Sequence, residues 1–203
     1  KDWRERVDRL SFAICNLGVR ESVADLLKEW NEQLSPTDMC FVVKNVGNSD
    51  WRRALELYEW YNRQHWFEPH ARMLAGILSI LGRAHQSFLA KEIFDRAMPT
   101  LGNCVQVYNA MMGVYARKGD INSVQKLLSH MKEKGYNRDL ITYNTVINAR
   151  CKAGLMPGMA IQLLKDMKKD HLTPDVVTYT SLIDGFARKC MFQDAFDMLK
   201  EME

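Results

Sequence analysis

Polar side chains that could hydrogen-bond to a ligand recur at a fixed spacing in the second half of the sequence. Asn109, Asn144 and Thr180 each follow a tyrosine, and they lie 35 and 36 residues apart. Asp139 and Asp175 also lie 36 residues apart, each five residues before one of these polar residues. An amide both donates and accepts hydrogen bonds, whereas a carboxylate only accepts. Such groups can recognise a polar ligand without any covalent chemistry.

A series of basic residues recurs in the same frame. Its members are Arg83, Arg117, Lys152 and Arg188. Each of the last three stands eight residues after the polar residue of its own segment. Cations in register along a repeat form a ladder that suits a polyanion. The alternative is a set of solvated helix ends, where basic residues favour the helix dipole. Four basic residues at equivalent positions favour contact with phosphates over this alternative.

Arrangements typical of enzymes are missing from the sequence. It has no H-x-E motif with P-C-x-x-C, no cluster of carboxylates and no nucleophile with a base at useful spacing. The histidines, which we expect at the surface near turns, are His65, His70, His85, His130 and His171. The cysteines, which form no C-x-x-C pair and which we expect to be reduced and buried, are Cys15, Cys40, Cys104, Cys151 and Cys190. We predict a protein that is not an enzyme and needs no cofactor and no metal.

Composition limits the partners further. The chain has 203 residues, 47% of them hydrophobic, and can therefore bury a core. Its net charge of +3 permits an anionic partner without requiring one. No run of eighteen apolar residues occurs, so we expect no membrane partner. Because the chain starts at Lys1 and stops at Glu203 inside a helical pattern, we expect a fragment of a longer protein.

The recurring side chains lie in units that each predict two helices. The first helix carries the tyrosine frame and ends near Gly119 or Gly154, and the second has apolar residues at helical spacing. In the last three units these apolar residues are Val124, Leu127, Leu128 and Met131; Ala160, Leu163, Leu164 and Met167; and Ala195, Met198, Leu199 and Met202. Ala54 and Ala90 mark the second helices of two units upstream. A two-helix unit cannot bury its own apolar faces, so such units stack.

We therefore predict an all-α fold, a right-handed α-solenoid of about six helical hairpins. The predicted divisions are an N-terminal helical pair or cap at 1–34, degenerate units at 35–70 and 71–104, regular units at 105–139 and 140–175, and a truncated unit at 176–203.

The period and several segments resemble the pentatricopeptide repeat family in its P-type form. These segments are YNTVINARCKAG, TPDVVTYTSLIDGFARK and LLKDMKKDHLTPD. The tetratricopeptide repeat has a similar period, but its W-x-x-L-G-x-x-Y pattern is absent. The segment LSPTDMCFVVKNVGNSDWRRALELYEW, with GDINSVQKLL and YNTVINAR, further resembles the N-terminal part of a large chloroplast member of land plants linked to group II intron splicing.

The resemblance implies binding of single-stranded RNA, with one base for each repeat. Two side chains in each repeat then read the base, and they correspond to Asn109 with Asp139 and to Asn144 with Asp175. In the family this pair reads uracil, with cytosine second. Thr180 implies a purine, either G or A. The structural alternative is that asparagine turns the chain near a helix start and that aspartate caps the helix.

A third position in the family is a wedge between neighbouring bases, and here it corresponds to Gln106, Ile141 and Val177. Gln106 departs from the usual Val or Ile. In the degenerate units the base-reading pairs would be Met39 with His70, and Ala75 with Cys104. Neither is a family combination, so we expect these units to extend or cap the solenoid. The tryptophans, for which we favour helix packing over base stacking, are Trp3, Trp30, Trp51, Trp60 and Trp66.

The resemblance also implies a role in plants, in an organellar RNA-processing factor. Chloroplast is the expected compartment, with the mitochondrion as the alternative, and splicing or RNA stabilisation is the expected process. Other organellar splicing or RNA-processing proteins are candidate partners. The alternative function is a protein-protein interaction scaffold, acting mainly through the N-terminal third.

Overall fold

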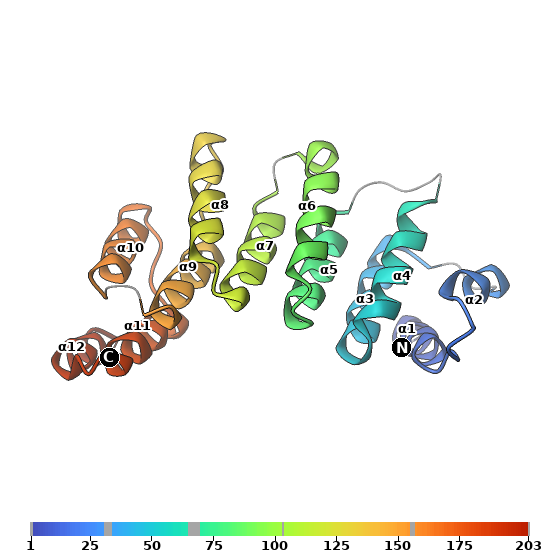
Figure 1. Ribbon diagram of the computed structural model, residues 1–203, viewed down its shortest axis with the longest axis horizontal. Coiled ribbons are helices and arrows are strands. Elements are labelled where there is room, and N and C mark those ends of the chain that lie inside the picture. The colour runs from blue at the N-terminus through green and yellow to red at the C-terminus, as the bar shows by residue number, and fades with distance from the viewer. Residues whose placement is uncertain (1, 31–33, 65–69, 103, 155–156, 203) are drawn as a thin grey trace. The chain divides into compact units, whose positions relative to one another are not determined.

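The computed structural model describes residues 2–30, 34–64, 70–102, 104–154 and 157–202. Every regular element in these ranges is an α-helix, which confirms the all-α prediction (Figure 1). The helices are α1 Asp2–Cys15, α2 Val23–Glu29, α3 Pro36–Ser49, α4 Trp51–Asn62, α5 Ala71–Arg83, α6 Ser87–Leu101, α7 Val105–Lys118, α8 Ile121–Glu133, α9 Leu140–Lys152, α10 Pro157–Lys169, α11 Val176–Arg188 and α12 Phe192–Met202.

The chain divides into two compact units, residues 1–111 and 112–203. In the first unit α1 packs on α3 and α3 packs on α5, while α4 contacts α2, α3 and α5, and α6 packs on α5. Helices that come first in their pairs therefore form a continuous layer. Val42, Val46, Ile77 and Leu81 are fully buried in this layer, and burial of each side chain stabilises the fold by about 1.5–3 kcal/mol.

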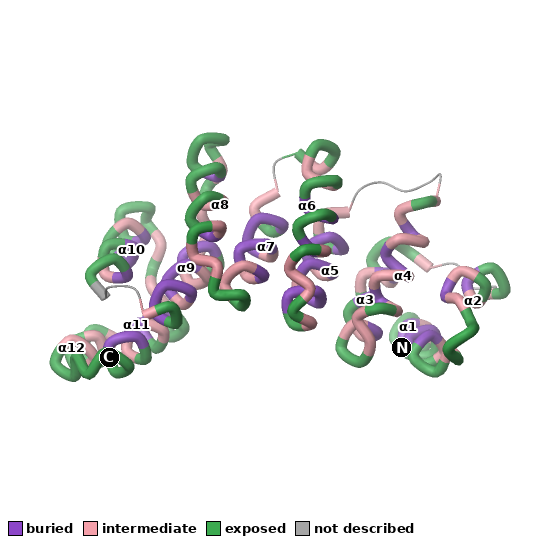
Figure 2. Tube along the Cα trace, in the orientation of Figure 1, coloured by how far each residue is buried: buried purple, intermediate pink, exposed green. Residues whose placement is uncertain are grey.

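The second unit repeats the arrangement. In this unit α9 packs on α11, α10 packs on both of these helices, α8 contacts α9, and α12 packs on α11. Tyr143, Ile147, Leu182 and Phe186 form its buried core. Figure 2 shows that buried residues are dense on α5 and α9, whereas α12 has none.

The first helices α3, α9 and α11 begin at capping residues that the sequence encodes. Ser35 caps α3 in a capping box with Asp38, since each side chain binds the other residue's backbone N–H. Asp139 caps α9 in the same way with Thr142. Such caps satisfy donors that would otherwise have no partner at the start of a helix. The backbone register of these units is therefore readable from the cap.

The turns that follow α5, α7, α9 and α11 share a left-handed conformation, although the residue at this position is not the same in all four turns. His85, Gly119, Gly154 and Cys190 have φ angles of 58°, 77°, 64° and 57°. Glycine adopts this region freely, whereas a residue with a Cβ does so at a cost of about 1–2 kcal/mol. Packing of the hairpins therefore imposes the turn even where the residue disfavours it.

The apolar pattern predicted for the second helices is buried in α10 but not in α12. Ala160, Leu163, Leu164 and Met167 are all buried. In α12, Ala195, Met198 and Met202 are only half-buried and Leu199 is 38% exposed. Two further apolar residues of this helix, Phe192 and Phe196, are 68% and 52% exposed. The described helix against which α12 packs is α11, so only part of its apolar surface is covered.

The expectation of buried cysteines is wrong for most of them. Cys151 is buried, Cys40 and Cys104 are half-buried, and Cys15 and Cys190 are exposed. Cys190 is exposed because it occupies the left-handed turn position, and Cys15 because it lies at the end of α1.

The tryptophans that can be described are partly packed. Trp3 lies 5.3 Å from Phe41 between ring centroids and is 38% exposed. Trp30, Trp51 and Trp60 are half-buried. Trp66, like His65, lies outside the described residues. Partial burial agrees with packing between helices.

We predict opposite effects for two substitutions at the left-handed turn. Gly119→Ala should lower the free energy of unfolding by about 1 kcal/mol because its added Cβ would meet no atom within 4 Å and the cost is conformational alone. Cys190→Gly should raise it by a similar amount. Urea denaturation of both variants measures this, and a loss of stability in Cys190→Gly would contradict the account.

Candidate functional site

Asn144 and Asp175, which the sequence paired as base-reading residues, lie in direct contact. Asn144 is in the first turn of α9, and Asp175 is the N-cap of α11. The Asn144 amide nitrogen Nδ2 donates to Asp175 Oδ1 at 3.0 Å. The carboxylate that starts one first helix therefore holds the side chain presented by the preceding first helix.

Thr178 completes this cluster, and the sequence analysis missed it. It is fully buried at the third position of α11. Its hydroxyl lies 2.6 Å from Asn144 Oδ1 and 2.9 Å from Asp175 Oδ1, while its backbone N–H donates to Asp175 Oδ1 at 2.9 Å. A threonine also stands at the third position of α9, Thr142, so the recurrence was a visible signal.

The cluster fixes which way the Asn144 amide faces. Nδ2 is directed to the carboxylate and Oδ1 to the hydroxyl, so one N–H of Nδ2 and one lone pair of Oδ1 are left over. Burial raises the pKa of Asp175, but hydrogen bonds from the Thr178 amide, Asn144 and Thr178 outweigh it and hold the pKa below its usual range. The amide therefore offers one donor and one acceptor in a fixed orientation.

The other predicted base-reading residues are in different settings. Asn109 is buried, with 7% exposed, in the unit that ends at residue 111. Asp139 belongs to the unit that begins at residue 112, where its carboxylate accepts from the Thr142 N–H at 2.7 Å. Thr180 is exposed, and its hydroxyl donates to the carbonyl of Val176 at 2.7 Å.

The three residues predicted to sandwich bases are all exposed. Ile141 is 61% exposed, Val177 is 53% exposed, and Gln106 is also exposed at the start of α7. Exposed aliphatic side chains at the same position of two first helices leave apolar surface for contact with a ligand. Ile141 stands three residues before Asn144, so both lie in the first turn of α9.

The four basic residues predicted to contact phosphates are exposed as well. Arg83 Nη2 donates to Asn48 Oδ1 at 3.1 Å, and Arg117 Nη1 donates to the Gly113 carbonyl at 3.1 Å. Arg188 pairs with Asp184, with 2.9 Å between Nε and Oδ2. The remaining member, Lys152, has no recorded partner among the described residues. Exposed pairs of this kind contribute little to stability and can be exchanged for a ligand.

The structure corrects the register of the unit predicted at 35–70. Ser35 is the N-cap of α3, so Met39 corresponds to Tyr143 and is likewise buried. Cys40, not Met39, therefore corresponds to Asn144. Its Sγ lies 3.7 Å from Nδ1 of His70, the N-cap of α5. The capping pattern S-x-x-D at 35–38 was the signal that locates this register.

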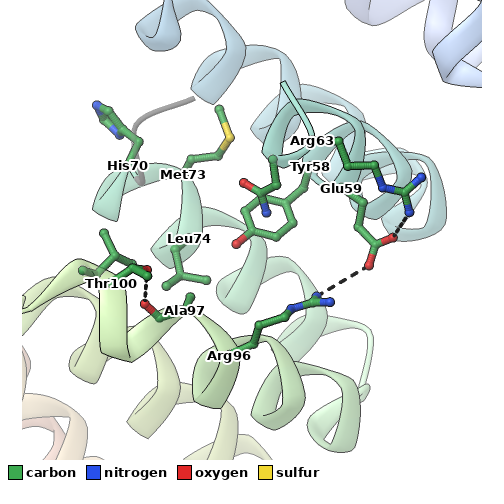
Figure 3. A pocket seen from close by; sticks show the side chains of 11 residues that line it. Tyr58, Glu59, Arg63, His70, Met73, Leu74, Arg96, Ala97 and Thr100 are labelled. Atoms are coloured by element: carbon green, nitrogen blue, oxygen red, sulfur yellow. Dashed lines mark hydrogen bonds and ion pairs between the residues drawn. The ribbon is translucent and has the colours of Figure 1, made fainter. Parts of the chain in front are cut away.

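A separate cavity of about 330 Å³ lies within residues 1–111, between α4, α5 and α6 (Figure 3). Tyr58, Met73 and Leu74 line it, and burial raises the pKa of Tyr58. At its rim Glu59 pairs with Arg63 and with Arg96, at 3.5 and 3.7 Å. No predicted base-reading residue other than His70 lines it.

The described ranges contain neither a candidate metal site nor a candidate membrane-spanning helix. No group of three or more His, Cys, Asp or Glu residues there could hold a metal ion. None of the helices described is long and apolar enough to span a membrane.

Comparison with known proteins supports one family. A sequence profile of the PPR repeat family matches residues 103–152, 138–188 and 174–203. The Arabidopsis thaliana pentatricopeptide repeat-containing protein At3g18110, chloroplastic, is 54% identical over 162 residues, which are 79% of this chain and 11% of that protein. At5g48730, chloroplastic, from the same plant is 27% identical over 156 residues, 75% of this chain and 30% of that protein. The chain thus spans less than a third of either relative.

Solved structures agree on the fold. The pentatricopeptide repeat protein PPR10 in complex with an 18-nt psaJ RNA element has a TM-score of 0.70 and 22% identity, covering 87% of this chain and 26% of that one. The PPR domain of Arabidopsis thaliana protein-only RNase P 1 in complex with tRNA has a TM-score of 0.63 and 16% identity, with 88% of each chain covered. The fold is therefore the predicted α-solenoid. The profile matches and the 54% identity to At3g18110 show that the chain belongs to the pentatricopeptide repeat family.

Proposed function

We propose that the chain binds single-stranded RNA with one base for each repeat. The observation that carries the proposal is the Asn144 amide, held in one orientation by Asp175 and Thr178 beside the exposed Ile141. An amide fixed in this way can read a base edge, and an apolar neighbour can contact the base face. Family membership and the RNA-bound structural neighbours support the proposal.

The preferred base at two repeats is uracil. Uracil presents an N–H between two carbonyl oxygens, so the Oδ1 and Nδ2 of an asparagine complement its edge. We assign this role to Asn144 with Asp175, and to Asn109 with Asp139. Thr180 would take a purine, G or A. Cytosine is the second choice at the asparagine positions because it also offers a polar pyrimidine edge. The proposed repeat boundaries are those of the predicted units, except that the N-cap at Ser35 supports a start at residue 36 for the first degenerate unit.

The cations Arg83, Arg117, Lys152 and Arg188 would contact the phosphates. All four are exposed, and those with recorded partners make only surface contacts. Because every nucleotide carries a phosphate, this contribution is independent of base identity.

The names of the relatives support an organellar location. Several similar Arabidopsis thaliana proteins carry the designation chloroplastic, and At1g80150 is mitochondrial. We therefore propose a chloroplast RNA-processing factor that acts in intron splicing or RNA stabilisation together with other organellar proteins. The second candidate is a protein-binding scaffold, favoured by exposed aromatic residues in the first unit such as Phe12, 72% exposed, and Phe88, 82% exposed.

The base-reading role predicts a specificity change on truncation of the two asparagines. By fluorescence anisotropy, a short RNA with a central UU followed by G should bind more tightly than its AA counterpart. The Asn109→Ala, Asn144→Ala double variant should lose this preference, a change of about thirtyfold because the hydrogen bonds of each asparagine contribute about 1 kcal/mol. Retention of the full preference would contradict base reading, and absence of RNA binding would favour the scaffold.

The cation ladder predicts a change in salt dependence without a change in specificity. With all four cations engaged, log Kd should rise with log salt concentration with a slope of about 3, since a single strand releases about 0.7 counterion per phosphate. Lys152→Ala should lower this slope by about 0.7 and should reduce the affinity for UU and AA RNAs by the same factor. Lys165→Ala, an exposed lysine of the second helix α10, is the matched control and should change nothing.

We predict that Thr178 supports both the stability of the fold and the preference for uracil. Thr178→Val keeps the volume but removes a buried hydroxyl, so unfolding free energy should fall by about 1–3 kcal/mol and the uracil preference should weaken. Thr180→Val on the same helix removes an exposed hydroxyl and should change stability by less than about 0.5 kcal/mol. Equal stability of the two variants in urea denaturation would show that the cluster does not stabilise the site.

A further inference from the structure

The degenerate unit predicted at 35–70, which we expected to extend or cap the solenoid, carries a side-chain pair at the base-reading positions. His70 is the N-cap of α5, just as Asp175 is the N-cap of α11, so these two residues correspond. Cys40 corresponds to Asn144, because each stands five residues after the N-cap of its own helix. Both Cys40 and His70 are half-buried, as Asn144 and Asp175 are. The geometry of a reading pair is therefore retained while its chemistry differs.

The two side chains contact each other. Sγ of Cys40 lies 3.7 Å from Nδ1 of His70, a distance typical of a hydrogen bond that involves sulfur. His70 makes no side-chain bond to the start of α5, unlike Asp175 at α11. Figure 3 shows its ring directed away from Leu74 and Thr100 of the nearby cavity. The imidazole is thus not committed to capping the helix.

The contact between the two side chains bears on which ring nitrogen of His70 carries a hydrogen. Burial raises the pKa of Cys40, with partial opposition from the positive charge of Arg72, so the sulfur keeps its hydrogen. Because a ring nitrogen is a stronger acceptor than sulfur, the proposed arrangement has the thiol donating to Nδ1 and the ring hydrogen on Nε2. The pair therefore presents an N–H donor where Asp175 presents an acceptor.

We propose that Cys40 and His70 form a third base-reading pair, which selects cytosine or adenine over uracil and guanine. The ring nitrogen at the centre of the pairing edge is an acceptor in cytosine and adenine, but it carries a hydrogen in uracil and guanine. An N–H donor at His70 complements the first two bases and opposes the other two. This inference rests on the proposed function, and it extends base reading into the first compact unit.

Other uses of the pair fit the structure less well. A nucleophilic thiol needs a lowered pKa, and the pKa of Cys40 is raised. A metal site needs a third ligand, and the described residues offer no group of three His, Cys, Asp or Glu side chains around one point.

The test uses the whole chain and short RNAs that differ at one base. The constant core is 5′-XAUUG-3′, in which UU faces the asparagine repeats and X, each of the four bases in turn, faces Cys40 and His70. The reversed core GUUAX tests the opposite strand polarity. Anisotropy should show X as cytosine or adenine bound about threefold to tenfold more tightly than uracil or guanine, the gain from one hydrogen bond.

Three variants identify the groups responsible. His70→Ala, which removes no capping bond, should make the four X bases equivalent. Cys40→Ser keeps a donor to Nδ1 and should retain the preference. Cys40→Asn, His70→Asp together should move the preference to uracil. Circular dichroism melting of each variant confirms that it is folded before its affinities are compared.

The outcomes separate this inference from the proposed function. Equal affinity for all four X bases, with UU still preferred over AA, would overturn the Cys40–His70 pair alone. Loss of the UU preference in the unmodified chain would overturn both. A preference for uracil or guanine at X would contradict the assigned donor at Nε2.

Discussion

The structure depends on one carboxylate that serves two helices. Asp175 caps α11 through the Thr178 N–H and at the same time accepts from the Asn144 amide of α9. The cap satisfies a backbone donor within one repeat, and the amide contact links that repeat to its neighbour. The interaction that positions a candidate ligand-binding group is therefore also one that stabilises helix packing. A ligand that binds Asn144 would meet a side chain whose orientation is already determined, which reduces the entropy cost of binding.

The residues of the first helices α9 and α11 fall into two groups, one that holds the fold together and one that is open to a partner. Thr178 and Tyr143 are buried and belong to the framework, whereas Ile141 and Lys152 are exposed and leave surface for a partner. Tyr143 is anchored further because its hydroxyl donates to Asp170 at 2.6 Å; burial and that carboxylate both raise its pKa. A buried framework residue beside an exposed variable one lets each repeat change what it contacts without changing how it folds.

Much of the fold could be predicted from the sequence because its signals are local and periodic. The 35- and 36-residue spacing, helical apolar patterns and capping residues lie within single units, and the helices begin where those caps stand. The family frame paired Asn144 with Asp175 as base-reading residues, but it did not predict the hydrogen bond between their side chains. The role of Thr178 did not, because it depends on a hydroxyl reaching back to the preceding helix.

Other features escaped prediction for physical reasons. The left-handed turns at His85 and Cys190 could not be predicted because neither position has a glycine. Packing of the hairpins imposes the conformation there. Cys40 was passed over because its unit lacks the tyrosine frame, and a one-residue error in register moves every position. Exposure of α12 was unpredictable from periodicity, which identifies an apolar face but not what covers it.

The most direct test observes Asn144 itself. In a ¹⁵N-edited NMR titration, the side-chain amide resonance of Asn144, assigned by its loss in Asn144→Ala, should shift in a saturable manner with RNA that contains UU. It should shift less with the AA counterpart at equal occupancy. An Asn144 amide that stays unchanged while the chain binds UU RNA would contradict the claim that this cluster reads a base.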